Sequence, residues 1–300
     1  MREINFLLRS MLYVPTYKKK FFEKISNFNA DAIILDLEDS VPAQFKEESR
    51  KNIAEFLNDY EVNPGKKLFV RLNSIESKLL LKDLEYVLSD KVDGFLLTKI
   101  YSADDMVYYD KLISQYENDN GLEVGHFMFA PLIETASAVI NAYPIAKSTE
   151  RVVALVFGGE DFLNDIGGFH GIPPKGLDFP RAQIVLAARS VRRGVLPIDT
   201  PYLKIHDDIG FQNEERLSFE MGFAGVQCIH PSQIELAHTC FMPTYREIEE
   251  SKKIVEAIDE TSRNGSGVAI FQGNLIGPPM EKRARKVLEL LKATEKIPHD

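Results

Sequence analysis

Three shortages narrow the classes of protein to which this 300-residue chain can belong. Two cysteines, Cys228 and Cys240, are too few for a disulfide framework, and the apolar run around Cys228 predicts a buried free thiol. The apolar N-terminal stretch is interrupted by Arg9 and is too short for a signal peptide or a membrane span, so we expect a cytoplasmic protein with no membrane partner. Positive charge is also scarce, because 45 acidic residues face 36 basic ones and leave a net charge of −9. This balance argues against a nucleic-acid partner, and an anionic small substrate would need local positive charge at its site.

Eight apolar runs recur through the first 240 residues, and segments with helical spacing separate most of them. The runs begin near Leu12, Ala32, Leu68, Gly94, His126, Arg151, Gly194 and Gly225. Runs that are apolar throughout indicate strands buried on both faces, as in a parallel sheet. Eight strands, each followed by a crossover of helical size, predict an α/β fold of the (β/α)8 TIM-barrel type over residues 1–240. The seventh run is the weakest strand prediction, because Pro197 interrupts it.

An open, doubly wound sheet is the alternative fold. That fold is expected to show a glycine-rich phosphate turn after its first strand, and the corresponding stretch here, LYVPTYKKK, has no glycine. Residues 241–300 show a different pattern, in which Thr244 is expected to cap one helix and an amphipathic helix follows Pro279. We expect these residues to form a C-terminal helical extension that packs on the barrel or on a neighbouring subunit.

Glu134 and Asp161 end two successive apolar runs. Side chains at the carboxyl ends of adjacent barrel strands can lie a few ångströms apart, and two close carboxylates repel each other unless a cation lies between them. Mg²⁺ suits this arrangement, because it is commonly bound by one or two carboxylates together with water and substrate oxygens. Helix N-capping is the alternative role for each residue taken alone.

Asp36, Glu38 and Asp39 follow the second run, and Arg71 ends the third. Alternation along a strand lets Asp36 and Glu38 share a face, so one can orient Arg71 while the other acts in proton transfer or supports the metal site. The guanidinium of Arg71 offers a fork for a carboxylate or an enolate oxygen. The alternatives are a solvated acidic loop and a purely structural ion pair between this loop and Arg71.

Four further residues are weaker candidates. Lys18 and Lys19, within a run of three lysines, could meet the phosphates of a large thioester cofactor or form a solvated surface. Lys99 could add positive charge for the same ligand or extend its ammonium into solvent. His230 could act as a base or a ligand, but a lone histidine is more often a hydrogen-bonded structural group.

Taken together, the blocks LYVP, AIILDLEDSV, VRLN, PLIET, GGEDF and VQCIHPSQ resemble the citrate lyase beta-subunit family, within the HpcH/HpaI superfamily of metal-dependent aldolases and acyl-CoA lyases. The resemblance implies a (β/α)8 barrel that assembles as a homotrimer or homohexamer. It also implies a lyase that uses Mg²⁺, or alternatively Mn²⁺, to cleave or form a carbon–carbon bond between a 2-oxo acid and an acetyl-type thioester of coenzyme A or an acyl carrier protein. By matching positions, Glu134 and Asp161 resemble the metal ligands, Arg71 the residue that contacts substrate and enolate, and Glu38 the acid nearby.

The tail departs from some relatives. Malyl-CoA and citramalyl-CoA lyases have an aspartate in a Gly-x-Met-Ile-Asp segment, where this chain has Gly277. This difference keeps two alternatives open beside a citryl-, malyl- or citramalyl-type thioester lyase. One is a metal-dependent aldolase that acts on a free 2-oxo acid and an aldehyde, and the other is a non-catalytic binding homologue.

Overall fold

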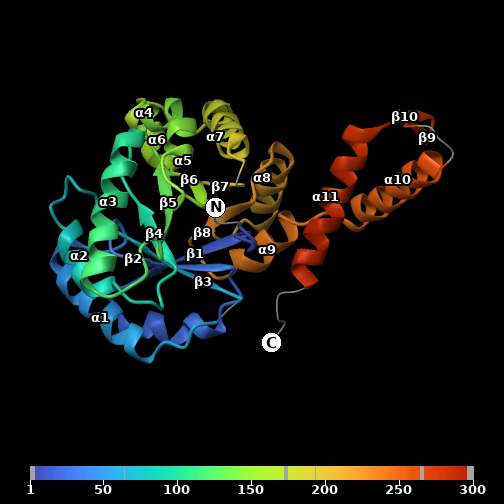
Figure 1. The fold of residues 1–300 in the computed structure, drawn as a ribbon. Coiled ribbons are helices and arrows are strands. Elements are labelled where there is room, and N and C mark those ends of the chain that lie inside the picture. The colour runs from blue at the N-terminus through green and yellow to red at the C-terminus, as the bar shows by residue number, and fades with distance from the viewer. Residues whose placement is uncertain (1–3, 64, 172–174, 193, 264–266, 296–300) are drawn as a thin grey trace. The chain divides into compact units, whose positions relative to one another are not determined.

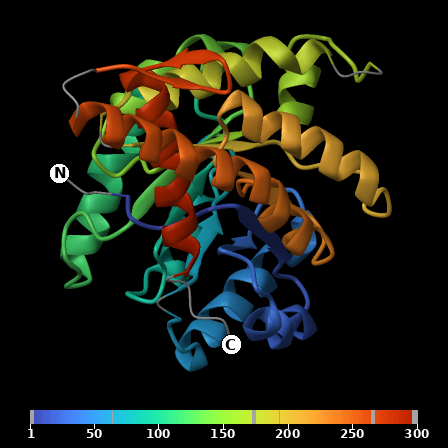
Figure 2. The same cartoon turned by 90° about the vertical axis from the view of Figure 1, so that its right-hand side faces the viewer.

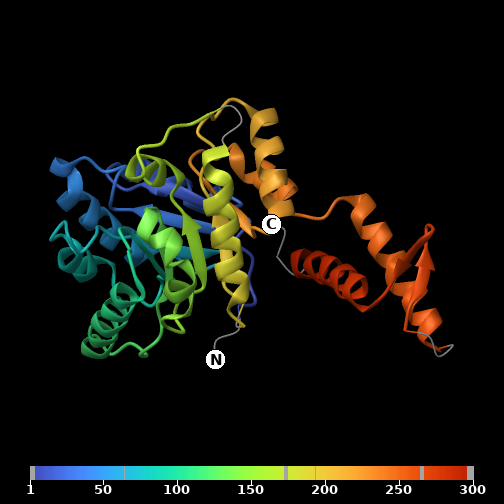
Figure 3. The same cartoon turned by 90° about the horizontal axis from the view of Figure 1, so that it is seen from above.

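The structure is a computed structural model that describes residues 4–63, 65–171, 175–192, 194–263 and 267–295. The chain divides into two compact units, Met1–His238 and Thr239–Asp300. Figure 1 shows the strands of the first unit at its centre with helices around them, and Figure 3 shows the same arrangement from above. No helix in the described ranges is both long and apolar enough to cross a membrane.

Eight parallel strands of the first unit form a closed barrel in chain order, from β1 beside β2 around to β8 beside β1. The predicted barrel fold is therefore confirmed, including its interrupted seventh strand. The strands are β1 (Ser10–Pro15), β2 (Ala32–Asp36), β3 (Lys67–Arg71), β4 (Gly94–Leu97), β5 (Met128–Ile133), β6 (Ala154–Phe157), β7 (Leu196–Asp199) and β8 (Gly225–Cys228).

Helices connect the strands and cover the outside of the barrel. They are η1 (Lys19–Asn27), η2 (Ala43–Phe45), α1 (Lys46–Asp59), α2 (Leu80–Val87), α3 (Ala103–Asp119), α4 (Ala136–Ile140), α5 (Ala142–Lys147), α6 (Gly159–Asp165), η3 (Lys175–Leu177), α7 (Asp178–Ser190), α8 (Asp208–Met221) and α9 (Gln233–Cys240). The first crossover differs from an ordinary barrel helix, because η1 is a 3₁₀ helix. Each connection returns the chain so that every strand runs in the same direction, and all eight carboxyl ends meet at one face.

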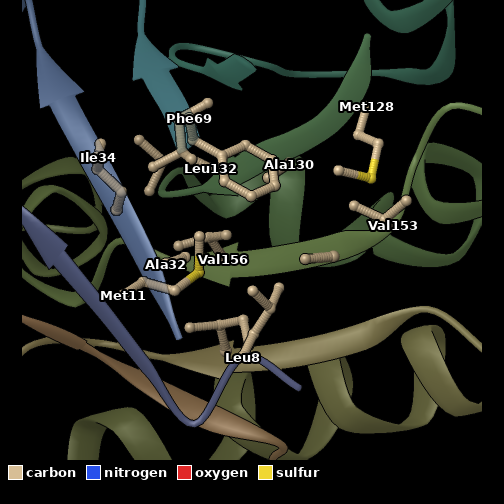
Figure 4. Close-up of a cluster of buried hydrophobic side chains, with 13 residues drawn as sticks. Leu8, Met11, Ala32, Ile34, Phe69, Met128, Ala130, Leu132, Val153 and Val156 are labelled. Atoms are coloured by element: carbon tan, nitrogen blue, oxygen red, sulfur yellow. The ribbon is translucent and has the colours of Figure 1, made fainter. Parts of the chain in front are cut away.

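Close-packed side chains fill the barrel. Figure 4 shows this cluster, in which side chains from several strands meet: Leu8, Met11, Ala32, Ile34, Phe69, Met128, Ala130, Leu132, Val153 and Val156. Alternate residues of a strand point inward, so Ala32 and Ile34 contribute to the filling and Asp36, two residues further on, reaches the carboxyl-end face. The apolar side chains that fill the barrel therefore lie directly below the charged residues at its carboxyl-end face.

The second unit contains two long helices and a hairpin: α10 (Tyr245–Arg263), β9 (Ala269–Phe271), β10 (Asn274–Ile276) and α11 (Pro278–Glu295). They are drawn orange to red in Figure 2. Thr244 caps α10 as expected, because its hydroxyl accepts the Glu247 amide while the Glu247 carboxylate accepts the Thr244 amide. Ile258, Ala269 and Ile276 form a small buried core between these elements. Gly277 precedes α11, and among the described residues a Cβ there would come within 4 Å of Val268 alone, at 3.5 Å. A Cβ, such as that of an aspartate, is therefore accommodated at this position by the described residues.

Candidate functional site

A cavity of about 460 Å³ opens at the carboxyl ends of the barrel strands. Its lining comes from seven of the eight strands or the loops that follow them and includes Tyr13, Asp36, Arg71, Glu134, Gly158, Gly159, Asp161, Thr200 and Gln227. Four of these are residues that the sequence predicts as catalytic or metal-binding. The barrel therefore brings Asp36, Arg71, Glu134 and Asp161, which lie far apart in the sequence, to a single site.

Arg71 is held by a carboxylate on the neighbouring strand. The register places Asp36 beside Arg71, and two parallel bonds join them, from Nε to Oδ1 and from Nη2 to Oδ2, each 2.6 Å long. Asp36 is fully buried and also accepts the backbone amides of Glu38 and Ser40. Burial alone would raise the pKa of Asp36, but Arg71 and these hydrogen bonds hold that pKa below its usual range. Asp36 is therefore ionised and fixes the orientation of the guanidinium.

Glu38 lies on the other edge of Arg71, with Oε2 3.0 Å from Nη1. Its carboxyl group behaves differently from that of Asp36, although both contact the same cation. Burial raises the pKa of Glu38 to about 8, because the charge of Arg71 only partly offsets desolvation and repulsion from Asp39 and Glu134. Arg71 is already paired with Asp36 at shorter range, which explains why its effect on Glu38 is incomplete. A carboxyl group with such a pKa can accept or donate a proton near neutral pH.

Glu134 and Asp161 share one positive charge. The Lys99 ammonium lies 3.4 Å from Glu134 Oε1 and 3.2 Å from Asp161 Oδ1. Glu134 is buried, whereas the Asp161 side chain is 41% exposed. Burial raises the pKa of Glu134, repulsion from Asp161 adds to this, and Lys99 opposes both. Burial would lower the pKa of Lys99, but the two carboxylates raise that pKa above its usual value, so the ammonium stays charged.

These residues fit a divalent cation. No cluster of three or more His, Cys, Asp or Glu residues that could hold a metal occurs in the described ranges. Mg²⁺, however, needs only one or two protein carboxylates, since water and substrate oxygens complete its octahedron. Oxygens of Glu134 and Asp161 both lie within 3.4 Å of one ammonium nitrogen, which shows that a single cation can contact both side chains.

Two glycines after β6 give these carboxylates room. A Cβ at Gly158 would lie 2.5 Å from the Glu134 Cβ, and one at Gly159 would lie 2.7 Å from the Thr200 hydroxyl oxygen. The Gly159 amide donates to this hydroxyl at 3.0 Å, so Thr200 anchors the start of α6, the helix that contains Asp161. The two glycines therefore let the backbone after β6 pass close to Glu134. The helix that follows then places Asp161 near Glu134.

Tyr13 and Gln227 were not expected to belong to the site. The Tyr13 ring packs against Arg71, with 4.8 Å between the ring centroid and Cζ, and its hydroxyl donates to Gln227 Oε1 at 2.8 Å. The Gln227 amide group donates to the carbonyls of Phe157 and Asp199. This fixes the glutamine, which in turn fixes the tyrosine beneath Arg71. The sequence feature that could have identified them is their position in apolar runs close to the carboxyl ends of strands. Neither side chain is charged, so neither is an obvious catalytic or metal-binding candidate.

Five candidates are not part of this lining. Glu38 and Lys99 contact the lining residues Arg71 and Glu134, and the other three are Lys18, Lys19 and His230. Lys18 lies over the Tyr17 ring, and Lys19 pairs with Glu55 on the exposed surface. Lys19 belongs to a separate groove of about 580 Å³ between η1 and α1, where Glu55, Asp59 and Glu61 would repel an anionic ligand. The His230 ring accepts the Ser232 amide locally. The roles of Lys18 and Lys19 as cofactor ligands remain predictions.

Comparison with known proteins gives a consistent result. Residues 9–231 match the model of a family described as HpcH/HpaI aldolase/citrate lyase. The chain is 33% identical to citrate lyase subunit beta of Haemophilus influenzae, over 96% of this chain and 98% of the relative. It is 32% identical to human mitochondrial citramalyl-CoA lyase, over 94% and 85%. The solved structure of protein CitE from Mycobacterium tuberculosis in complex with magnesium, acetoacetate and coenzyme A aligns with a TM-score of 0.79 and 25% identity, covering 96% of this chain and all of that one.

Proposed function

This chain belongs to the HpcH/HpaI aldolase/citrate lyase family, and we propose that it is a Mg²⁺-dependent carbon–carbon lyase that acts on an acyl thioester. The substrate class is a citryl-, malyl- or citramalyl-type thioester, which yields a 2-oxo acid and an acetyl-type thioester. The observation that carries the proposal is that a carboxylate pair, Glu134 and Asp161, and a clamped guanidinium, Arg71, line the same cavity. The similarity to a lyase subunit and to a citramalyl-CoA lyase supports it.

Glu134 and Asp161 are the residues that would hold the ion. Bound Mg²⁺ would supply Lewis-acid polarisation and a template for the 2-oxo acid portion of the substrate. Gly158 leaves the space next to Glu134 free of side-chain atoms, so the carboxylate can face the cavity. Lys99 donates its backbone amide to Glu134 Oε1 at 2.8 Å, which orients this carboxylate.

Arg71 and Glu38 divide the remaining chemistry. Cleavage removes the hydroxyl proton of the substrate and breaks the bond to the α-carbon of the thioester, and the released enolate then takes up a proton. Glu38 is the residue that we assign to transfer of the hydroxyl proton. Its pKa of about 8 leaves a minor fraction of the carboxyl group ionised near neutral pH; this ionised form accepts the proton, and the protonated form can return it. Arg71 is oriented by Asp36 before the reaction begins and presents positive charge where the enolate oxygen develops. A donor placed in this way contributes about 3–4 kcal/mol to a transition state.

The proposal also includes the expected cytoplasmic location and the homotrimeric or homohexameric assembly, both of which rest on the sequence. Lys18 and Lys19 remain proposed contacts for the thioester carrier on the sequence pattern alone. Both are exposed beyond the end of β1, and a phosphate of the carrier would have to displace Glu55 from Lys19.

A substrate panel tests the function. The purified protein is incubated with Mg²⁺ and citryl-CoA, malyl-CoA or citramalyl-CoA, and 2-oxo acid release is followed through reduction of the acid by a coupled dehydrogenase. We expect turnover of at least one thioester, loss of turnover in EDTA, and recovery when Mg²⁺ is restored. Cleavage of free 4-hydroxy-2-oxo acids but of no thioester would replace the proposal with the aldolase alternative.

The Glu134→Gln variant tests the carboxylate pair in the same assay. We expect turnover to fall at least tenfold and the Mg²⁺ concentration for half-maximal rate to rise, because an amide is a neutral and weaker ligand. Glu85→Gln, on the exposed face of α2, is the control and should behave like the unmodified protein. Unchanged turnover and metal dependence in Glu134→Gln would remove this residue from the site.

A further inference from the structure

Lys99 contacts the carboxylate pair in two ways. Its backbone amide donates to Glu134 Oε1 at 2.8 Å, and its ammonium lies 3.4 Å from the same oxygen and 3.2 Å from Asp161 Oδ1. The residue follows β4, and its side chain is 29% exposed, so the ammonium that contacts the two carboxylates is also partly open to solvent. One lysine therefore orients Glu134 through its backbone and neutralises both carboxylates through its side chain.

The backbone of Lys99 adds an independent observation. Its φ angle is +52°, in the left-handed region that side chains with a Cβ rarely adopt. Glycine or asparagine would adopt this conformation at lower cost, and either would keep the amide that Glu134 needs. The hydrogen bond to Glu134 therefore accounts for the backbone conformation, but it does not account for a lysine side chain. The side chain must be explained by what its ammonium contacts, and those contacts are the two carboxylates.

A divalent ion and this ammonium need the same oxygens. Two cations held by one pair of carboxylates would repel each other strongly in a partly buried site. We propose that Lys99 is a built-in competitor of the divalent ion, so that ammonium and metal bind the Glu134–Asp161 pair alternately and Lys99 sets the metal affinity of the site. This role differs from the contact with a thioester cofactor that the sequence suggested for Lys99, because it places the ammonium on the protein's own carboxylates.

The ammonium does two things under this proposal. Without the metal, it prevents the carboxylate pair from destabilising the fold through repulsion, which a buried Glu134 would otherwise intensify. With the metal, it must withdraw toward solvent, and its partial exposure makes this movement possible without rearrangement of the barrel. The protein would therefore have a weaker but more readily exchanged metal site than the two carboxylates alone would form.

Binding of Mn²⁺ in the absence of substrate tests this inference, which rests on the proposed metal site. Electron paramagnetic resonance counts free Mn²⁺ directly, so the dissociation constant is measured without any assay of activity. Replacing Lys99 by Met removes the charge and keeps an unbranched apolar side chain, and we expect Mn²⁺ to bind about tenfold more tightly or better. Lys99→Arg retains the charge and should bind Mn²⁺ about as weakly as the unmodified protein.

Lys67→Met is the matched control. Lys67 also pairs with a carboxylate, that of Asp93, at 2.8 Å, but it lies at the amino end of β3, away from the cavity. This variant should leave Mn²⁺ binding unchanged. Lys99→Asn replaces Lys99→Met if the methionine variant does not fold, because asparagine tolerates the left-handed backbone.

The possible results distinguish the competition by Lys99 from the metal site on which it depends. Equal or weaker Mn²⁺ binding in a folded Lys99→Met or Lys99→Asn variant overturns the competition and leaves the lyase proposal intact. Failure of the unmodified protein to bind any Mn²⁺ overturns the metal site itself and the proposed function with it. Tighter binding in the neutral variants but not in Lys99→Arg supports the competition.

Discussion

Replacing Asp36 by Asn is the sharpest test of how Arg71 is positioned. Asn keeps the size of the side chain but removes its charge and turns one acceptor oxygen into a donor group. Both carboxylate oxygens are in use, since each accepts one guanidinium N–H at 2.6 Å and one backbone amide. At least one of these four bonds must therefore be lost or become a contact between two donors.

The stability cost follows from the burial of the pair. Asp36 has no exposed surface, and the Arg71 side chain is only 12% exposed, so the guanidinium cannot recover its hydration by a small movement. Breaking a buried ion pair by removing one partner costs about 3–5 kcal/mol. Glu38 remains within 3.0 Å and can ionise more readily in the variant, so we expect the lower end, about 3 kcal/mol.

Asp31→Asn is a matched control, because Asp31 also forms a buried ion pair and directly precedes β2, the strand that ends in Asp36. Asp31 accepts two bonds from the Arg9 side chain, of 2.8 Å and 2.7 Å, and one of 2.8 Å from the Arg9 backbone amide, and both residues are buried. This pair lies at the start of β2, at the opposite end of the barrel from Asp36. It should therefore lose a similar amount of stability while leaving the cavity intact.

Urea denaturation and steady-state kinetics together decide the question. We expect both variants to lose unfolding free energy, but only Asp36→Asn should lose kcat, by about 100-fold, because Arg71 is no longer held in place for the enolate. Mg²⁺ affinity should change little in either variant. If the two folded variants have kcat values within threefold of each other, the Asp36–Arg71 pair is a structural ion pair and its catalytic interpretation is wrong.

Two further predictions concern Glu38 and Gly158. In EDTA, the folded protein keeps a proton on Glu38 up to about pH 8, whereas the unfolded chain loses it near pH 4.5, so this group makes stability fall as pH rises between these values. Urea denaturation at pH 5 and pH 8 should show that Glu38→Gln removes at least about 1 kcal/mol of this decline, and equal pH dependence in both proteins would refute the raised pKa. Gly158→Ala places a methyl group against Glu134, so we expect Mn²⁺ to bind about tenfold more weakly and the protein to lose about 1–2 kcal/mol of unfolding free energy. Gly176→Ala is the control, because its new methyl group would make only a 3.5 Å contact, and it should change neither quantity. Unaltered Mn²⁺ binding in Gly158→Ala would show that Glu134 does not need this space.

The sequence predicts the barrel because its signal is repeated eight times. Each buried strand is a short apolar run, and the absence of glycine after the first strand argues against the open alternative. The carboxyl-end residues are predictable for the same reason, since Asp36, Arg71, Glu134 and Asp161 each lie at or near the end of an apolar run. The 3₁₀ form of η1 was not predictable, because Phe21, Phe22 and Ile25 fit an α-helical spacing equally well.

Which charges pair with which was harder to predict than where they lie. Asp36 and Glu38 were interchangeable candidates for the orienting carboxylate, and the register of β2 with β3 decides for Asp36. Lys99 is the clearest case, since its contact with both acids depends on a left-handed backbone that no local residue preference indicates. Tyr13 and Gln227 depend on contacts between strands that are neighbours only because the barrel closes.

The pairing of charges explains how one cavity can hold several carboxylates and still fold. Arg71 neutralises Asp36 at short range, and Glu134 and Asp161 share the ammonium of Lys99. The charge of Glu38 is only partly neutralised by Arg71, which helps to explain its raised pKa. Because each cation is already committed, adding a divalent ion changes the balance at one pair and leaves the Asp36–Arg71 clamp in place. Under the proposed function, a metal can therefore bind to the Glu134–Asp161 pair and leave it without disturbing the group that we assign to the enolate.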